Sequence, residues 1–253
     1  DKAGDSDVAV AFDDVTLQYK NAGEPSLEHI SFTVPRGSVV GIIGGTGSGK
    51  SSLVSLIPHF YDIKDGRVSV FGKNVCAYDD EDLRHRIGYV QQKAVLFQGT
   101  VRSNLLWGDD SASDDDLRTA LSTAQVLDIV ADKGGLDAPV EQNGANFSGG
   151  QKQRLSVARA LVRKPQILVL DDSSSALDYA TEAAMRKAIL ALPYKPTLFI
   201  VSQRASSVMC ADRILVLEDG RLVGDGTHKA LLANCPAYCE IYHSQFSEEV
   251  TDA

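Results

Sequence analysis

The sequence predicts an α/β protein with a buried parallel sheet and a helical insertion. After Pro35 the strands read as continuous apolar runs, such as 39–43 and 167–170, which are typical of parallel strands covered on both faces. Strand and helix patterns alternate again beyond Pro165. Between about 92 and 162 strand patterns are sparse and apolar residues recur at helical spacing, which predicts an inserted helical subdomain.

Each element is predicted from its local pattern. The stretch 8–19 alternates and is rich in Val, Phe and Thr, and Pro35-Arg36-Gly37 turns the strand at 30–34 into the next one. In chain order the predicted elements are strands at 8–19, 30–34, 39–43 and 66–71 with a helix at 50–60, helices within 92–162 that include 152–162, a strand at 167–170, a helix through 185–192, a strand at 198–201, and a hairpin of 214–217 with 221–223 across Asp219-Gly220. A buried strand thus precedes each of two motifs described below.

Composition narrows the class of protein. The 253 residues suit one large domain, or one domain with an inserted lobe, and 43% hydrophobic with 23% charged residues is ordinary for a globular chain. The net charge of −9 argues against a general nucleic-acid binder, because neutralising phosphates needs a basic surface. No apolar stretch is long enough to span a bilayer. The four cysteines form no C-x-x-C pair and the five histidines show no ligand spacing, so we expect reduced thiols, a cytosolic setting and no metal held by these residues.

A glycine-rich loop with the spacing Gly, four residues, Gly-Lys-Ser follows the strand at 39–43. It reads Gly44, Gly45, Thr46, Gly47, Ser48, Gly49, Lys50 and Ser51. Glycines let successive backbone N–H groups turn toward one point and cradle phosphate oxygens, and the helix that follows adds partial positive charge. Lys50 can reach the β- and γ-phosphates and the Ser51 hydroxyl can ligate Mg²⁺. The loop therefore predicts a nucleoside triphosphate site.

Two further motifs support this site. Asp171-Asp172 follows the strand at 167–170, where Mg²⁺ needs a partner carboxylate, and we assign Asp171 to the metal. Ser148-Gly149-Gly150-Gln151 precedes a helix-forming segment, with Ser148 as a natural N-cap. Alone, the second motif reads as a capping turn and the first as two acids in a solvated loop. Combined with the glycine loop they are specific.

Together these motifs resemble the ATP-binding-cassette (ABC) ATPase family over residues 8–246. The loop at 44–51 resembles Walker A, 167–171 resembles Walker B, and 148–151 resembles the family signature, with Phe147 where leucine is commoner. Ser175-Ala176-Leu177-Asp178 resembles the D-loop. The resemblance implies a P-loop NTPase (RecA-like) core with an N-terminal antiparallel β-subdomain. The core would comprise 1–91 and 163–253, and 92–162 would form the helical signature subdomain.

The resemblance also assigns roles to individual residues, with ATP and Mg²⁺ as cofactors. The cofactor-binding residues are Tyr19, Gly44, Gly45, Thr46, Gly47, Ser48, Gly49, Lys50, Ser51, Ser52 and Asp171, and those that reach a partner's ATP in trans are Ser148, Gly149, Gly150, Gln151 and Asp178. The metal ligands are Ser51, Gln92 and Asp171, and the catalytic residues are Asp172, Gln203 and Gln92. Tyr19 would stack on adenine, although alone it reads equally as an edge-strand aromatic. Such stacking discriminates poorly between purines.

Within the family the exporter branch fits best. The segments 96–104 and 226–232 look like those of exporter nucleotide-binding domains. The resemblance implies two such domains paired head to tail with two ATP molecules between them, and transmembrane helices that precede Asp1 in a longer polypeptide. The chain would then lie at the cytoplasmic face of the cell membrane, with transmembrane domains as partners and no nucleic acid.

Two departures from the family pattern bear on mechanism. Asp172 stands where a glutamate usually positions the attacking water, and the shorter side chain withdraws the carboxylate by roughly 1.5 Å. A misplacement of that size can slow a positioned reaction by about a hundredfold. Gln203 stands where a histidine usually bridges the γ-phosphate and the water, and an amide cannot carry a proton charge near neutral pH. A third, weaker departure is Gln142 in place of glutamate before the signature.

A near-intact signature with an altered catalytic pair predicts one half of a heterodimeric bacterial multidrug-type exporter. The chain's own site would turn over slowly, and its signature would complete a partner's competent site. Other readings stay open: neighbours that rescue catalysis, a regulatory module without hydrolysis, a soluble family ATPase acting on nucleic acid, and an importer subunit. The negative charge and the lack of a long coiled-coil insertion argue against the nucleic-acid enzyme.

Overall fold

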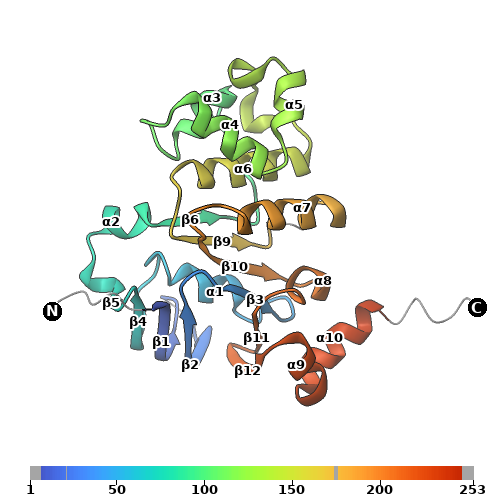
Figure 1. Cartoon of the computed structure of the whole chain (residues 1–253). Helices are drawn as coiled ribbons and strands as arrows, with labels where there is room; N and C mark the ends of the chain where they lie inside the picture. The colour runs from blue at the N-terminus through green and yellow to red at the C-terminus, as the bar shows by residue number, and fades with distance from the viewer. Residues whose placement is uncertain (1–6, 21, 174–175, 247–253) are drawn as a thin grey trace, which may run out of the picture. The chain divides into compact units, whose positions relative to one another are not determined.

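The computed structural model describes residues 7–20, 22–173 and 176–246 (Figure 1). These residues fall into two compact units. The first unit comprises Asp1–Arg84 and Thr197–Ala253, and the second comprises His85–Pro196. The helical subdomain expected at 92–162 lies inside the second unit, and its boundaries stay a prediction.

The first unit contains an antiparallel sheet near the N-terminus, which confirms that part of the predicted fold. Among the described residues its strand order is β2-β1-β4-β5. The strands are β1 (Val8–Leu17), β2 (Leu27–Pro35), β4 (Asp65–Val70) and β5 (Lys73–Asn74). Phe12 and Phe32 face each other across β1 and β2 and stack with ring centroids 4.6 Å apart. Alternate residues of β2 are buried, so this sheet has one covered face.

The first unit also contains parallel strands, and the glycine loop starts from the central one. β3 (Val39–Ile43) lies between β10 (Thr197–Ser202) and β11 (Arg213–Glu218) and is parallel to both. Every residue of β3 and β10 is buried, as their continuous apolar runs predict. β12 (Arg221–Gly226) pairs antiparallel with β11. Asp219 and Gly220 at their turn both have positive φ, so the predicted hairpin is confirmed.

Most helices described in the first unit have fewer than eight residues, and the longest is α10 (Pro236–Phe246). The others are α1 (Lys50–Ser55), α8 (Ala205–Val208) and α9 (His228–Asn234), with a 3₁₀ turn at Val75–Ala77, and α2 (Asp80–His85) spans the division. The predicted helix at 50–60 was wrong at its C-terminal end. Pro58 explains the early stop, because proline lacks an N–H and disfavours helical backbone in the residue before it. Helices α9 and α10 were not predicted from the sequence.

The second unit is mainly helical, and its longer strand pair is β6 (Ile87–Val90) with β9 (Ile167–Asp171). These two strands run parallel, and β6 was not predicted. The helices are α3 (Val101–Leu106), α4 (Asp114–Thr123), α5 (Leu127–Asp132), α6 (Gly149–Val162) and α7 (Tyr179–Leu190), with 3₁₀ turns at Gly135–Asp137 and Gln142–Gly144 and a short pair of β7 (Gly99–Thr100) with β8 (Pro139–Val140). The periodic residues Leu117, Ala120 and Leu121 are buried, as helical spacing predicted.

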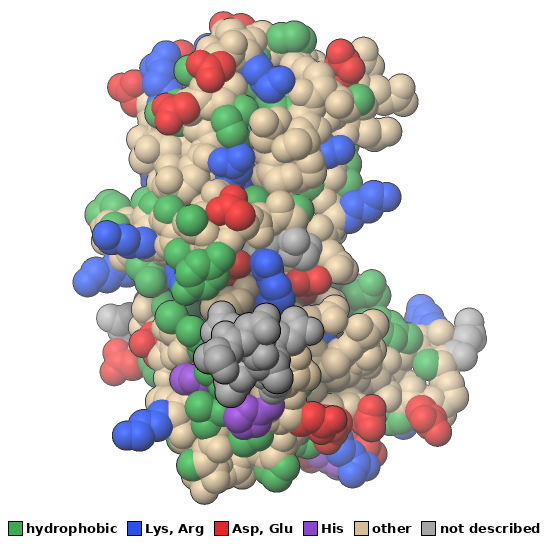
Figure 2. All heavy atoms as spheres, turned by 90° about the vertical axis from the view of Figure 1, so that its right-hand side faces the viewer, with side chains coloured by type: hydrophobic (Ala, Val, Ile, Leu, Met, Phe, Trp, Pro, Cys, Tyr) green, Lys and Arg blue, Asp and Glu red, His purple; other side chains and the backbone are tan. Residues whose placement is uncertain are grey.

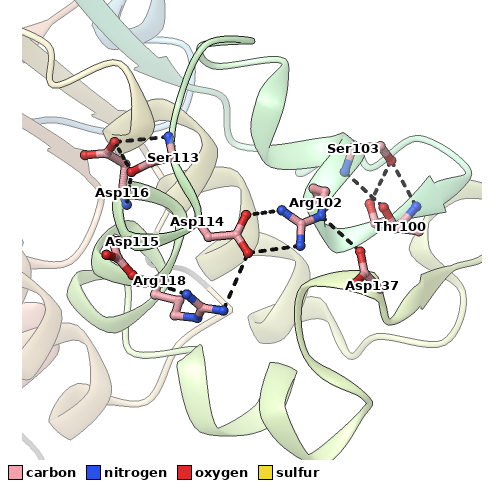
Figure 3. Close-up of polar contacts among 9 residues, drawn as sticks. All are labelled: Thr100, Arg102, Ser103, Ser113, Asp114, Asp115, Asp116, Arg118 and Asp137. Carbon is pink, nitrogen blue, oxygen red and sulfur yellow. Dashed lines mark hydrogen bonds and ion pairs between the residues drawn. The ribbon is translucent and has the colours of Figure 1, made fainter.

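An ion-pair network joins α3, α4 and the Gly135–Asp137 turn of the second unit (Figure 3). Arg102 on α3 pairs with Asp114 at the start of α4 and with Asp137 of the following 3₁₀ turn. Arg118, one turn further along α4, pairs with Asp114 and Asp115. The guanidinium of Arg102 lowers the pKa of the Asp114 carboxyl below its usual value. The network therefore ties α3, α4 and the 137 turn together through charge-assisted contacts.

The surface carries charges of both signs. On the described part of the face in Figure 2, Lys and Arg side chains lie scattered and form no continuous basic stripe. Within the described residues, no helix has both the length and the apolar character that a bilayer crossing needs. The four cysteines are free thiols. Nor do the described residues include a group of three or more His, Cys, Asp or Glu side chains arranged to hold a metal ion.

Candidate nucleotide-binding site

The glycine loop has a backbone path that only glycine accommodates at two positions. A Cβ atom on Gly44 would lie 2.2 Å from the carbonyl oxygen of Leu217 and 2.6 Å from the Ser48 hydroxyl. Gly49 is the N-cap of α1 with φ of 97°, a left-handed conformation that L side chains disfavour. At Gly45, by contrast, an added Cβ meets nothing within 4 Å. The loop is thus packed against the protein at Gly44 and Gly49 and open at Gly45.

Lys50 is buried at the centre of this loop. Only 8% of the residue is exposed, and its Nζ donates to the carbonyl oxygens of Gly44 (2.9 Å) and Gly45 (2.6 Å). In a trans peptide the N–H points opposite to the preceding C=O, so the same peptide planes turn the N–H groups of Gly45 and Thr46 away from the ammonium. A loop with an internal cation and glycines where a Cβ would clash fits a phosphate group.

Tyr19 and Ser52 lie together in the first unit. The Tyr19 hydroxyl donates to Ser52 Oγ at 2.9 Å, which ties the residue beyond β1 to helix α1. The Tyr19 ring meets Tyr61 edge to face with centroids 5.0 Å apart. Both rings line a cavity of about 650 Å³ that also includes His59 and Asp62. Tyr19 therefore has an aromatic ring beside an accessible space, as stacking on a base requires.

Gln203 follows β10 and contacts the glycine loop. The Thr46 hydroxyl donates to Gln203 Oε1 at 3.2 Å. This contact joins residues 157 positions apart and lies wholly within the first unit. The structure thus brings the predicted switch residue to the predicted phosphate loop.

The second unit carries the predicted carboxylates and Gln92. Asp171 ends β9, is 6% exposed, and accepts a hydrogen bond from the Tyr89 hydroxyl at 2.9 Å. Asp172 has φ of 45°, and its Oδ2 accepts from Gln92 Nε2 at 2.9 Å. The side chain expected to position water is therefore held by the side chain expected to ligate the metal.

The signature motif forms the start of α6. Ser148 Oγ accepts from the Gln151 backbone N–H at 3.3 Å, and Gln151 Oε1 accepts from the Ser148 N–H at 3.0 Å, which is a complete capping box. A Cβ on Gly150 would lie 2.9 Å from the carbonyl oxygen of Ala176. The glycine thus lets the signature approach the D-loop segment, of which Ser175 lies outside the described residues.

Asp178 is the N-cap of α7. It accepts hydrogen bonds from the backbone N–H of Thr181 at 2.9 Å and from its hydroxyl at 2.8 Å. These bonds lower the pKa of the Asp178 carboxyl below its usual value. A role of Asp178 toward a partner's ATP stays a prediction.

Two residues that contact the site were not predicted from the sequence. Tyr89 donates to Asp171 across 82 positions, and Gln245 on α10 bonds to the backbone around Gln203. Neither follows a motif or a periodic pattern, so a single sequence gives no signal for them. Both contacts form only when distant segments come together in the fold.

Comparison with known proteins identifies the family. The family model described as "ABC transporter" matches residues 27–175. The chain belongs to the ABC transporter family. It is 43% identical over 245 residues to the "Uncharacterized ABC transporter ATP-binding protein YfiB" of Bacillus subtilis, covering 96% of this chain and 42% of that protein. It is 39% identical over 241 residues to the ATP-dependent lipid A-core flippase of Haemophilus ducreyi, covering 94% of this chain and 41% of the flippase.

A solved structure supports the same assignment. A bacterial Atm1-family ABC exporter with ATP bound matches with a TM-score of 0.90 and 36% identity, covering 94% of this chain and 42% of that one. The chain thus spans 42% and 41% of the two curated relatives. The predicted P-loop NTPase fold is confirmed, and the chain is an ABC ATP-binding domain of the exporter type. Membership implies ATP binding with Mg²⁺ and ATPase chemistry.

Proposed function

We propose that this ABC domain binds Mg-ATP at the Walker A loop and hydrolyses it slowly at its own site, while its signature motif completes a competent site on a partner domain. The whole protein would export a substrate across a membrane, with this domain on the cytoplasmic face and transmembrane domains as partners. The relatives support the transport role, because they include an ATP-dependent lipid A-core flippase and an Atm1-family ABC exporter.

The binding half of the proposal rests on the glycine loop. Lys50 holds its ammonium among the loop carbonyls, from which it can move to the β- and γ-phosphates. Tyr19 offers its ring beside a cavity, and Ser51 with Asp171 and Gln92 would hold Mg²⁺. When bound, the ion neutralises charge on the transferring phosphate. The oxygen ligands in this set are those that Mg²⁺ prefers.

The slow-hydrolysis half rests on one observation: the Asp172 carboxylate is short and already bonded to Gln92. An effective base must reach the proton of the attacking water, within about 2.6–3.2 Å of it. A carboxylate that is one methylene short and tied to a neighbouring amide is poorly placed to do so. Gln203, whose Oε1 accepts from Thr46, can offer N–H donors to phosphate but cannot move a proton.

The partner role rests on the signature. Its capping box is complete and its glycines are present, so the α6 N-terminus retains the features that contact phosphate in trans. An intact signature beside an altered catalytic pair favours pairing with a different chain that carries the usual glutamate and histidine. A purely regulatory domain would also carry Asp172 and Gln203, and ATP turnover distinguishes the two possibilities.

The test is ATP turnover at this chain's own site, compared with that of its Asp172→Glu, Gln203→His variant. We expect the variant to be faster by up to about a hundredfold, the cost of a misplacement near 1 Å. Adding Lys50→Met to the variant is the control, because it removes the phosphate grip and should abolish the gain. Equal rates in wild type and variant would contradict the slow-site proposal. A variant that binds ATP yet never turns over would favour the regulatory alternative.

A further inference from the structure

The C-terminal helix α10 reaches the switch segment through one side chain. Gln245 Nε2 donates to the carbonyl oxygen of Gln203 at 2.8 Å, and Gln245 Oε1 accepts from the backbone N–H of Ala205 at 2.8 Å. The side-chain amide of Gln245 therefore bonds through both its nitrogen and its oxygen to backbone groups two positions apart. α8 and α10 belong to the same unit and contact each other there, and Figure 1 labels both helices.

This contact takes the place of a helix cap. Ala205 is the first residue of α8, and Arg204 at its N-cap makes no side-chain cap bond. The first N–H groups of a helix have no partner within the helix, and Arg has no acceptor to offer them. Gln245 supplies the missing acceptor from 40 positions away. The start of α8 thus depends on α10.

The remaining backbone of the segment is fixed locally. Ser202 is fully buried at the end of β10, and its Oγ accepts from the Arg204 N–H at 3.0 Å. Together with the two bonds from Gln245, three backbone groups of the segment 202–205 are hydrogen-bonded: the Gln203 carbonyl and the N–H groups of Arg204 and Ala205. The side chain of Gln203 leaves from the middle of this segment and meets Thr46.

We propose that Gln245 is a positioning residue that fixes the backbone of 202–205 and thereby aims the Gln203 amide at the γ-phosphate of ATP. The inference rests on the proposed function for the role of Gln203, and the contact with the backbone stands apart from it. It makes α10 part of the nucleotide-sensing machinery. The domain should then distinguish ATP from ADP less well when the contact is cut.

The position of α10 itself does not depend on Gln245. Tyr238 on α10 is fully buried, and its hydroxyl lies 2.7 Å from His228 Nδ1 of α9. Tyr242 stacks on Phe246 within the same helix with centroids 4.6 Å apart. Gln245 is exposed, so its substitution should leave the helix docked and the fold intact.

Two substitutions separate the two hydrogen bonds. Gln245→Met removes both with little change of size. Gln245→Glu keeps an acceptor for the Ala205 N–H and loses the donor to the Gln203 carbonyl. Glu240→Gln, at another exposed position of α10, is the matched control. The first readout is hydrogen exchange of the Ala205 amide in the nucleotide-free chain, and the second is the ratio of ATP to ADP affinity.

We expect Gln245→Met to speed exchange at Ala205 by about fivefold and to lower the preference for ATP over ADP by a similar factor, the worth of about one hydrogen bond. Gln245→Glu should keep the Ala205 amide protected and still lose the ATP preference. The control should change neither. ADP serves as an internal standard, because damage to the fold would weaken both nucleotides alike.

Two results would overturn the proposal. Unchanged exchange at Ala205 in Gln245→Met would show that the contact does not form. Faster exchange at Ala205 with an unchanged ratio of ATP to ADP affinity would show that Gln245 stabilises the backbone but does not position Gln203. Neither readout depends on ATP turnover. If the wild-type chain hydrolysed ATP as fast as the Asp172→Glu, Gln203→His variant, the slow-site proposal would be wrong, but the positioning role of Gln245 would be unaffected.

Discussion

Neighbouring glycines of the Walker A loop should respond very differently to the same added methyl group. At Gly44 a Cβ would lie 2.2 Å from the Leu217 carbonyl oxygen, and at Gly45 it would meet nothing within 4 Å. Leu217 belongs to the buried strand β11 and cannot move freely. Gly44→Ala therefore forces a backbone shift, whereas Gly45→Ala enters open space.

The expected sizes follow from these contacts. Overpacking of this kind costs about 1–3 kcal/mol, and more where the neighbour is backbone. Gly49→Ala combines a left-handed φ of 97°, worth about 1–2 kcal/mol, with a Cβ 2.9 Å from the Ser26 carbonyl oxygen. Gly45→Ala should be neutral or stabilising by about 0.4–1 kcal/mol, because it restricts only the unfolded chain. We expect Gly49→Ala to be the least stable of the three.

The assay is urea unfolding followed by far-UV circular dichroism without nucleotide, since bound ligand would shift the apparent stability. A domain of this size loses about 2–4 °C of Tm per kcal/mol, so thermal melts should rank the variants in the same order. Fluorescence would be a poor probe, because the one tryptophan, Trp107, lies in the second unit. If Gly45→Ala lost as much stability as Gly44→Ala, the loop would not be packed as described.

Three further predictions concern the second unit. Tyr89→Phe removes the hydroxyl that orients the Walker B carboxylate, so the Mg²⁺ requirement for ATP binding should rise about tenfold in a magnesium titration. The bonds from Lys164 and Ser113 lower the pKa of Asp116 to about 2, so its contribution to stability is complete above about pH 3.8. That contribution is lost as the pH falls toward 2. Lys164→Met should therefore flatten the fall in Tm over this range, whereas the same substitution at exposed Lys187 should not. Asn104→Leu removes three hydrogen bonds from a buried side chain to the 97–100 segment and should cost about 2–4 kcal/mol in urea unfolding; an unchanged midpoint would contradict this.

The sequence predicted best those features that depend on neighbouring residues. The apolar run at 39–43 predicted a buried strand because every side chain of β3 is covered. Ser148 was predicted as the N-cap of the following helix, and its Oγ accepts from the Gln151 backbone N–H at the start of α6. The Asp219-Gly220 pair predicted a tight hairpin because both residues tolerate positive φ.

What the sequence could not predict depends on contacts between distant segments. The tie of Gln245 to the switch segment spans about 40 positions, and that of Tyr89 to Asp171 spans 82. An exposed glutamine on a helix has no pattern that distinguishes it from a solvated one. The predicted helix at 50–60 was too long for a different reason. Pro58 indicates a helix end, but the prediction followed the apolar pattern beyond it.

The backbone at Asp172 supplies a physical reason for the short acid there. Its φ of 45° is left-handed, a conformation that aspartate and asparagine adopt several times more often than other non-glycine residues. The short side chain also reaches Gln92 within the same unit, whereas Gln203 is held by Thr46 in the other unit. Each altered residue is thus held by a hydrogen bond within its own unit in the absence of ATP. Asp172→Glu would leave the left-handed backbone at residue 172 in place, at some conformational cost, and would lengthen the carboxylate side chain by one methylene. Gln203→His would restore only a side chain that can carry a proton. If the proposed slow site is correct, one change restores the reach of the carboxylate and the other restores proton transfer, so we expect faster hydrolysis only when both are made.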